Sequence, residues 1–215
     1  MLLVFAVRDQ GELSEEQIAR SFQAIQGNGT AFATATLLSA AICIPLILGI
    51  IKLKSGAALR DYLALNAVPI KTVLLWLAIL TAFLAASDFL TIFLGRPLVP
   101  EFMTEIYPSA RPIWLMWLAL VVVAPLLEEI YFRGFLFKGL AAGPIGPIGA
   151  IVATAILWAL IHIQYDVYGI ATIFFQGLLA GAARLKTGSL TVPVLMHAEA
   201  NLIAAFETVL VLRLT

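Results

Sequence analysis

The sequence predicts an all-α protein, a polytopic bundle of about six transmembrane helices. Hydrophobic residues make up 62% of the 215 residues, and charged residues only 12%. This composition is far from that of a soluble domain. Long apolar stretches recur along the chain, and a helix of roughly 20 apolar residues is long enough to cross a bilayer. Acidic and basic residues number 13 each, so the chain lacks the excess of positive charge typical of nucleic-acid-binding proteins.

The N-terminal part of the chain predicts an extramembrane segment followed by two spans. Residues 1–30 are expected to lie outside the bilayer or at its interface, and a short helix capped by Ser14 is predicted over residues 12–26. The two transmembrane helices form the next unit, residues 31–95, with apolar stretches at about 31–53 and 71–95. A polar loop with several prolines is predicted over residues 96–111.

The C-terminal part predicts four further spans that form one unit over residues 112–213. The apolar stretches cover residues 112–140, 147–164, 167–186 and 190–212. The second of these is short and is expected to end at His162. The residues that follow it, Gln164, Tyr165 and Asp166, must then line or cap a cavity, because irregular backbone at membrane depth has to be covered by protein or water.

The positions of lysine and arginine predict the orientation, because basic loops are retained on the cytoplasmic side. If loop 54–70 is cytoplasmic, its side of the membrane collects Lys52, Lys54, Arg60, Lys71, Lys138, Arg184 and Lys186. The other side collects Arg8, Arg20, Arg96, Arg111 and Arg213, together with most of the acidic residues. Both termini are therefore expected outside, in a membrane that we expect to be the inner membrane of a bacterium.

Several ionisable residues lie inside the C-terminal spans, where a charge is costly and usually functional. They are Glu128, Glu129, Arg133, His162, His197 and Glu199. Glu129 and Arg133 are four residues apart, so they share a helix face and are expected to form an ion pair. Glu128 points about 100° away from Glu129, and it has no partner on its own helix. Glu199, and Asp88 in an earlier span, are interpreted as structural.

The depths of these residues predict that they meet. At 1.5 Å per residue, Glu128 lies about 18 Å from one end of its helix and His162 about 22 Å from the same side. His197 and Asn201 share a helix face, and Asn201 approaches the level of Glu128. A carboxylate beside a histidine can take a proton from water, and a histidine with an asparagine can stabilise an oxyanion. The residues therefore predict a hydrolytic site, which is expected to open toward the cytoplasm.

The same residues leave two other interpretations open. Glu128, His162 and His197 could bind zinc, since one glutamate and two histidines form a known ligand set. They come from three helices, however, and lack the HExxH pair that presents two histidines on one face, so no metal or other cofactor is favoured. The whole set could instead be a polar network that only holds helices together.

Three motifs in this region resemble those of a known family. They are EEIYFR at residues 128–133, WALIH at 158–162 and SLTVPVLMHAEAN at 189–201. In order and approximate spacing they resemble the EExxxR, FxxxH and HxxxN motifs of the CAAX protease and bacteriocin-processing family (Abi) of intramembrane endopeptidases. This family includes the type II CAAX prenyl endopeptidase, the Ras-converting enzyme. The resemblance covers about residues 110–205 and implies a four-helix catalytic core.

The resemblance implies catalytic roles for four residues. Glu128 would activate water together with His162, and His197 with Asn201 would form the oxyanion site. Such an enzyme resembles a glutamic-type peptidase, although the family has long been described as metalloproteases. The implied substrate is a peptide or a membrane protein, and its identity does not follow from the motifs.

The resemblance also implies supporting roles. Glu129 and Arg133 would be structural, in agreement with the expected ion pair. Trp158 stands where the family often has phenylalanine, so its contacts under His162 are expected to be adjusted.

Two functions from other classes use the same residues. The first is a non-catalytic membrane protein that binds a peptide in this pocket, such as a bacteriocin-immunity protein. The second is a proton or ion carrier, since buried carboxylates and histidines also form relays. A carrier needs polar residues along a continuous path, and residues 31–53 offer almost none.

Overall fold

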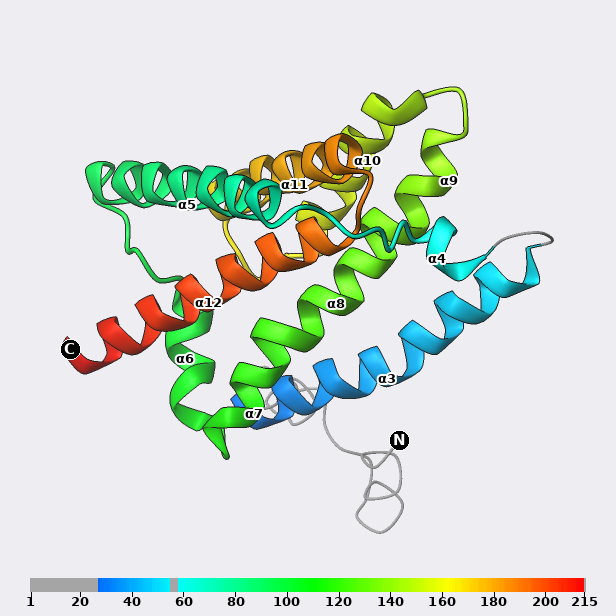
Figure 1. Ribbon diagram of the computed structural model, residues 1–215. Helices are drawn as coiled ribbons and strands as arrows, with labels where there is room; N and C mark the ends of the chain where they lie inside the picture. The colour runs from blue at the N-terminus through cyan, green and yellow to red at the C-terminus, as the bar shows by residue number, and fades with distance from the viewer. Residues whose placement is uncertain (1–26, 55–57, 215) are drawn as a thin grey trace, which may run out of the picture.

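The computed structural model describes residues 27–54 and 58–214, and these residues form helices and connecting loops without a strand (Figure 1). The helix expected over residues 12–26 lies outside the described residues, as does most of the segment 1–30. The all-α bundle predicted from the sequence is confirmed.

Within the described residues, five helical segments are long and apolar enough to cross a membrane. Four of the predicted spans correspond to α3 (Gly29–Leu53), α5 (Ile70–Phe93), α11 (Val167–Thr187) and α12 (Thr191–Leu214). The fifth segment is one continuous helix that contains two π-helical stretches. Its parts are α7 (Ile113–Trp117), η1 (Leu118–Val123), α8 (Ala124–Glu129), η2 (Ile130–Leu136) and α9 (Phe137–Ala141).

The remaining predicted span is shorter than expected. Helix α10 (Gly146–Leu160) has 15 residues, which gives a length of about 22 Å against a hydrocarbon core of roughly 30 Å. The bundle therefore has five full spans among the described residues, where about six were predicted. The helix ends just before His162, close to the predicted end. Two further short helices, α4 (Leu59–Tyr62) and α6 (Glu101–Ser109), lie in the loops on either side of α5.

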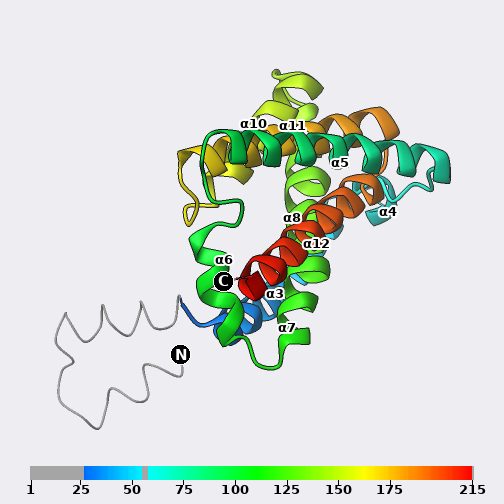
Figure 2. The ribbon, with the colours of Figure 1, turned by 90° about the vertical axis from the view of Figure 1, so that its left-hand side faces the viewer.

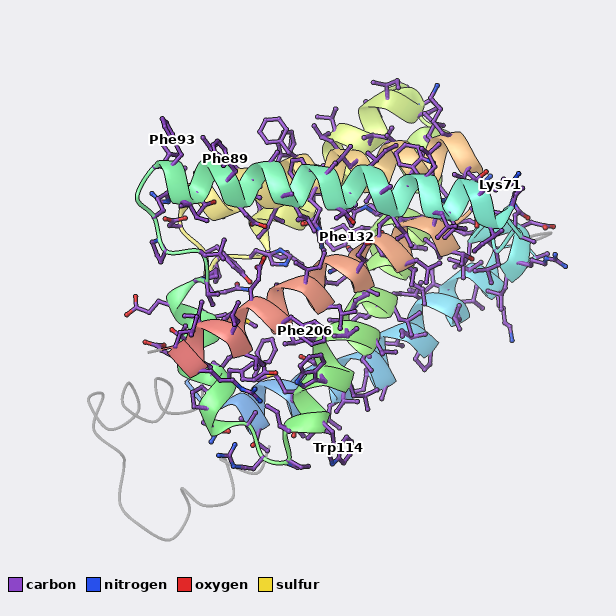
Figure 3. The ribbon with its side chains drawn as sticks, turned by 60° about the vertical axis from the view of Figure 1, so that its left-hand side comes forward. Lys71, Phe89, Phe93, Trp114, Phe132 and Phe206 are labelled. Carbon is purple, nitrogen blue, oxygen red and sulfur yellow. The ribbon has the colours of Figure 1, made fainter. Side chains whose placement is uncertain are left out.

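The outer surface of the bundle is apolar. Figure 3 shows Phe89 and Phe93 on α5 pointing away from the other helices, and they are 72% and 75% exposed. Trp114, at the start of α7, is likewise exposed. A surface with large exposed apolar side chains suits lipid rather than water, because apolar side chains cost nothing in contact with lipid chains.

Two glycines allow α10 and α11 to approach closely, and the helices run side by side in Figures 1 and 2. A Cβ atom at Gly177 would lie 3.1 Å from the Ala155 Cβ and from Trp158 Cε3. A Cβ atom at Gly181 would lie 2.9 Å from a methyl carbon of Ile151. Small residues at such contacts let transmembrane helices come together, and here they bring Trp158 against α11.

The structure corrects the prediction for Arg184. This residue was counted among the basic residues that set the orientation on the side of loop 54–70, but it is buried at 6% exposure. Its Nε donates to the main-chain oxygen of Arg133 at 3.1 Å, and its guanidinium lies over the Phe137 ring. The long side chain reaches from the last turn of α11 into the bundle, where a carbonyl and an aromatic face satisfy the cation.

Candidate active site

A cavity of about 460 Å³ lies among α5, α6, α11 and α12. At its inner part it is lined by Trp158, His162, His197 and Asn201. Gln164, Tyr165 and Asp166 also line it, as predicted for the segment after α10. The cavity therefore brings together three of the four predicted catalytic residues, and the fourth, Glu128, contacts the cavity wall through Trp158.

Glu129 connects two helices rather than one. The expected ion pair is present, with Arg133 Nη1 2.8 Å from Glu129 Oε1, and both side chains are fully buried. The same oxygen is 3.0 Å from His197 Nδ1. Because the oxygen also accepts from the guanidinium, His197 is the donor in this second bond. The spacing of Glu129 and Arg133 along one helix predicted their ion pair. The bond between Glu129 and His197 joins α8 to α12, and a pattern within one helix cannot predict it.

Glu128 occupies a different environment from the predicted one. It was expected to face His162, but its Oε2 accepts a hydrogen bond from Trp158 Nε1 at 2.5 Å and lies 4.0 Å from His197 Nε2. No hydrogen bond or ion pair joins Glu128 to His162, both of which are among the described residues. They are nevertheless close enough for the charge of Glu128 to act on the imidazole. The indole of Trp158 has an N–H donor that phenylalanine lacks. This N–H donates to the carboxylate of Glu128.

Trp158 contacts four polar side chains of the site, including Glu128 through its indole N–H. Its ring lies 5.3 Å from the His162 ring and 5.1 Å from the His197 ring, edge to face in both cases. The guanidinium carbon of Arg133 is 4.5 Å from the indole centroid, a cation–π distance. Trp158 was predicted to pack under His162. The structure shows that it also contacts Glu128, His197 and Arg133.

His162 is held through one nitrogen. Its Nδ1 lies 2.7 Å from the main-chain oxygen of Trp158, and a carbonyl can only accept, so Nδ1 carries a proton. In the neutral imidazole Nε2 is then free to accept a hydrogen bond. Tyr165 lies nearby, with ring centroids 6.0 Å apart. Burial, and then the charge of Glu128, raise the pKa of Tyr165 to about 12, so its hydroxyl keeps its proton at neutral pH.

Asn201 is oriented by the π-helical stretch η1. Its Nδ2 donates to the main-chain oxygen of Leu120 at 2.7 Å. One amide hydrogen remains for another acceptor. π-Helical turns recur at functional sites, and in this helix one such stretch holds Asn201 while Arg133 lies in the other.

Two acidic residues were expected to be structural, and both have partners on another helix. Glu199 accepts a hydrogen bond from Thr81 at 3.0 Å, which joins α12 to α5. Asp88 lies beside Glu207 across the same two helices, and both line the cavity. Glu207 was overlooked in the sequence, although an acid inside an apolar span was the available signal.

The cavity reaches the surface at the end of the bundle opposite to the one expected. Its lining includes the exposed residues Glu101, Gln164 and Asp166, and also Arg96, which is paired with Asp166. Arg96 lies in the loop before α6, Glu101 begins α6, and Gln164 and Asp166 lie in the loop before α11. The prediction that the cavity opens on the same side as loop 54–70 is therefore wrong. The physical reason is that α10 stops at Leu160, so the space beyond its end is left for the cavity.

The zinc alternative requires a group of three ligands. Among the described residues, no three histidine, cysteine, aspartate or glutamate side chains are grouped so that they could hold a metal ion. Glu128, His162 and His197 are therefore not placed as one such group in this arrangement of the side chains.

Comparisons with known proteins connect these residues to a family. Residues 110–203 match the family model described as type II CAAX prenyl endopeptidase Rce1-like. An uncharacterized 24.3 kDa protein of Escherichia coli is 34% identical over 113 residues, which cover 50% of this chain and 51% of that protein. The chain thus spans about half the length of this relative. No solved structure matches the chain.

The match bears out the resemblance drawn from the three motifs. The matched segment contains Glu128, His162, His197 and Asn201. Together with the five long apolar helices, the match supports an integral membrane protein with a segment similar to the CAAX prenyl endopeptidase family model.

Proposed function

We propose that this chain, which carries an Rce1-like segment over residues 110–203, is an intramembrane endopeptidase that hydrolyses a peptide bond with water activated by Glu128. One observation carries the proposal. The imidazole of His197 lies between two carboxylates, 3.0 Å from Glu129 and 4.0 Å from Glu128, and it also lines the cavity. A carboxylate base and the hydrogen-bond donors of His197 are therefore close to the same part of the cavity.

Glu128 is the general base. It takes a proton from water, and the water oxygen attacks the carbonyl carbon of the substrate. The indole of Trp158 holds the carboxylate in place at 2.5 Å. His162 assists through its free Nε2, which accepts a second hydrogen bond from the water or from the substrate. When the tetrahedral intermediate collapses, the proton on Glu128 passes to the leaving amine.

His197 and Asn201 stabilise the oxyanion. Because Nδ1 of His197 already donates to Glu129, Nε2 can donate only if the imidazole carries both protons. The second amide hydrogen of Asn201 is the other donor. Fixed donors of this kind act on the charge that develops in the transition state.

The proposed reaction uses no metal, since the described residues provide no three-ligand group and Glu128 with His162 supplies the base. The expected substrate is a peptide or a segment of a membrane protein bound at the lipid bilayer, and no nucleic acid is involved. Activity in the presence of a chelator is expected to equal that without it. Loss of activity that zinc restores would contradict this part of the proposal.

The proposal is tested by Glu128→Gln in purified protein with a peptide library and mass spectrometry of the products. Removing a general base is expected to lower the rate about 10²- to 10⁴-fold. Glu199→Gln is the matched control, because it also removes a carboxylate from a span but lies in a contact with Thr81. Cleavage by Glu128→Gln at the wild-type rate would refute the assignment.

A further inference from the structure

The cavity mouth and the basic loops lie at opposite ends of the bundle. Lys71 begins α5 and Phe93 ends it, and Figure 3 shows them at the two ends of this helix. The cavity is lined by the later part of α5, from Leu84 to Thr91, and by the loop that follows it. On α11 it is lined by the beginning of the helix, from Tyr168 to Gln176. The mouth therefore belongs to the end that holds Phe93.

The charges on the two ends differ. With Arg184 buried, the end that holds Lys71 has six exposed basic residues, Lys52, Lys54, Arg60, Lys71, Lys138 and Lys186. The described acid at that end is Asp61. Among residues 27–54 and 58–214, the other end has Arg96, Arg111 and Arg213, which are matched by Glu101, Glu105 and Asp166. The basic end has the composition that is retained in the cytoplasm.

We infer that the cavity opens on the face of the membrane away from the cytoplasm, and that its substrate is a polypeptide segment presented from that side. An exported protein, or the non-cytoplasmic part of a membrane protein close to its span, is the matching class of substrate. The orientation follows from the charges and the cavity alone. The substrate class rests in addition on the proposed function.

The rim of the cavity suits such a segment. Glu101 and Gln164 are exposed at the mouth, and Arg96 bonds Asp166 beside them. The entrance is therefore polar, while the inner wall contains Leu84, Leu120 and Trp158. A chain that arrives in water would meet polar groups first and the catalytic groups afterwards.

Cysteine labelling tests the orientation without any need for activity. The single cysteine is first removed by Cys43→Ser. One cysteine is then introduced at the rim, Gln164→Cys, and another at the basic end, Lys138→Cys, since both positions are exposed. Bacterial cells expressing each variant are treated with a membrane-impermeant maleimide before and after permeabilisation. The rim cysteine is expected to react in intact cells, and the Lys138→Cys variant only after permeabilisation.

Two results would overturn the inference: a rim cysteine that is protected in intact cells, or a cysteine at Lys138→Cys that is labelled in intact cells.

A second measurement concerns the substrate. A cleavable peptide is added to right-side-out and to inverted vesicles, with Glu128→Gln as the blank. Cleavage is expected in right-side-out vesicles. Cleavage only in inverted vesicles would refute the substrate class while the proposed function stood. Absence of cleavage by detergent-solubilised protein as well would refute the proposed function and, with it, the substrate class.

Discussion

At the scale of the residue, Trp158 stands where the family that the motifs resemble often has phenylalanine, and apart from that with His162 its contacts with the site could not be predicted from the sequence. Its indole donates to Glu128 at 2.5 Å. We predict that Trp158→Phe keeps the apolar ring but loses this donor. A hydrogen bond to a charged group contributes about 1.5–3 kcal/mol, so kcat is expected to fall roughly tenfold to a hundredfold, with KM little changed.

The control for this change is Trp117→Phe, because Trp117 packs against Phe206 on the outer part of α12 and not against the site. The indole N–H signal of Trp158 in a ¹⁵N-labelled sample provides a second measurement, and it should move in Glu128→Gln. If kcat of Trp158→Phe equals that of the wild type, the indole does not position the base.

Glu129 carries the second prediction at this scale. Glu129→Gln leaves the guanidinium of Arg133 buried without its counter-charge, which typically costs about 3–5 kcal/mol, so the melting temperature should fall. The double variant with Arg133→Met removes both charges of this pair, and stability should largely return. Activity should stay low in both, because His197 loses the carboxylate that fixes its Nδ1 proton. Recovery of activity in the double variant would show that Glu129 is only structural.

At the scale of the element, the sequence predicted contacts within a helix better than contacts between helices. Periodicity along one helix predicted that Glu129 pairs with Arg133, and hydropathy predicted the spans and the early end of α10. The bonds from His197 to Glu129 and from Trp158 to Glu128 join separate helices. They depend on how α10 and α12 pack against α8, and no single-helix pattern contains those distances.

The approach of α10 to α11 leads to a prediction for Gly177. A Cβ atom there would lie 3.1 Å from Trp158 Cε3. We predict that Gly177→Leu separates the two helices, displaces the indole from Glu128 and lowers both the melting temperature and the activity, since overpacking costs about 1–3 kcal/mol. Gly49→Leu is the control, because a Cβ atom at Gly49 meets nothing within 4 Å. Unchanged activity of Gly177→Leu would contradict the role of this contact.

At the scale of the whole molecule, two predictions from the sequence were not sufficient to predict on which side the cavity opens. The basic loops predicted one end as cytoplasmic, and helix depths predicted that Glu128 and His162 meet. To predict where the cavity opens, one must also know at which end of the bundle a short helix leaves room for it. Depths of about 18 and 22 Å in a core of roughly 30 Å already bring both residues nearer to the far end, where α10 stops.

The central claim is that Glu128 activates water and does not itself attack the substrate. A single turnover in H₂¹⁸O, with enzyme in excess over peptide, separates the two mechanisms. If the carboxylate were the nucleophile, one of its own oxygens would be passed to the first product. The proposed mechanism predicts that the new C-terminal carboxylate of the product contains one ¹⁸O and that the mass of the protein is unchanged. An unlabelled product together with ¹⁸O in the peptide that contains Glu128 would contradict it.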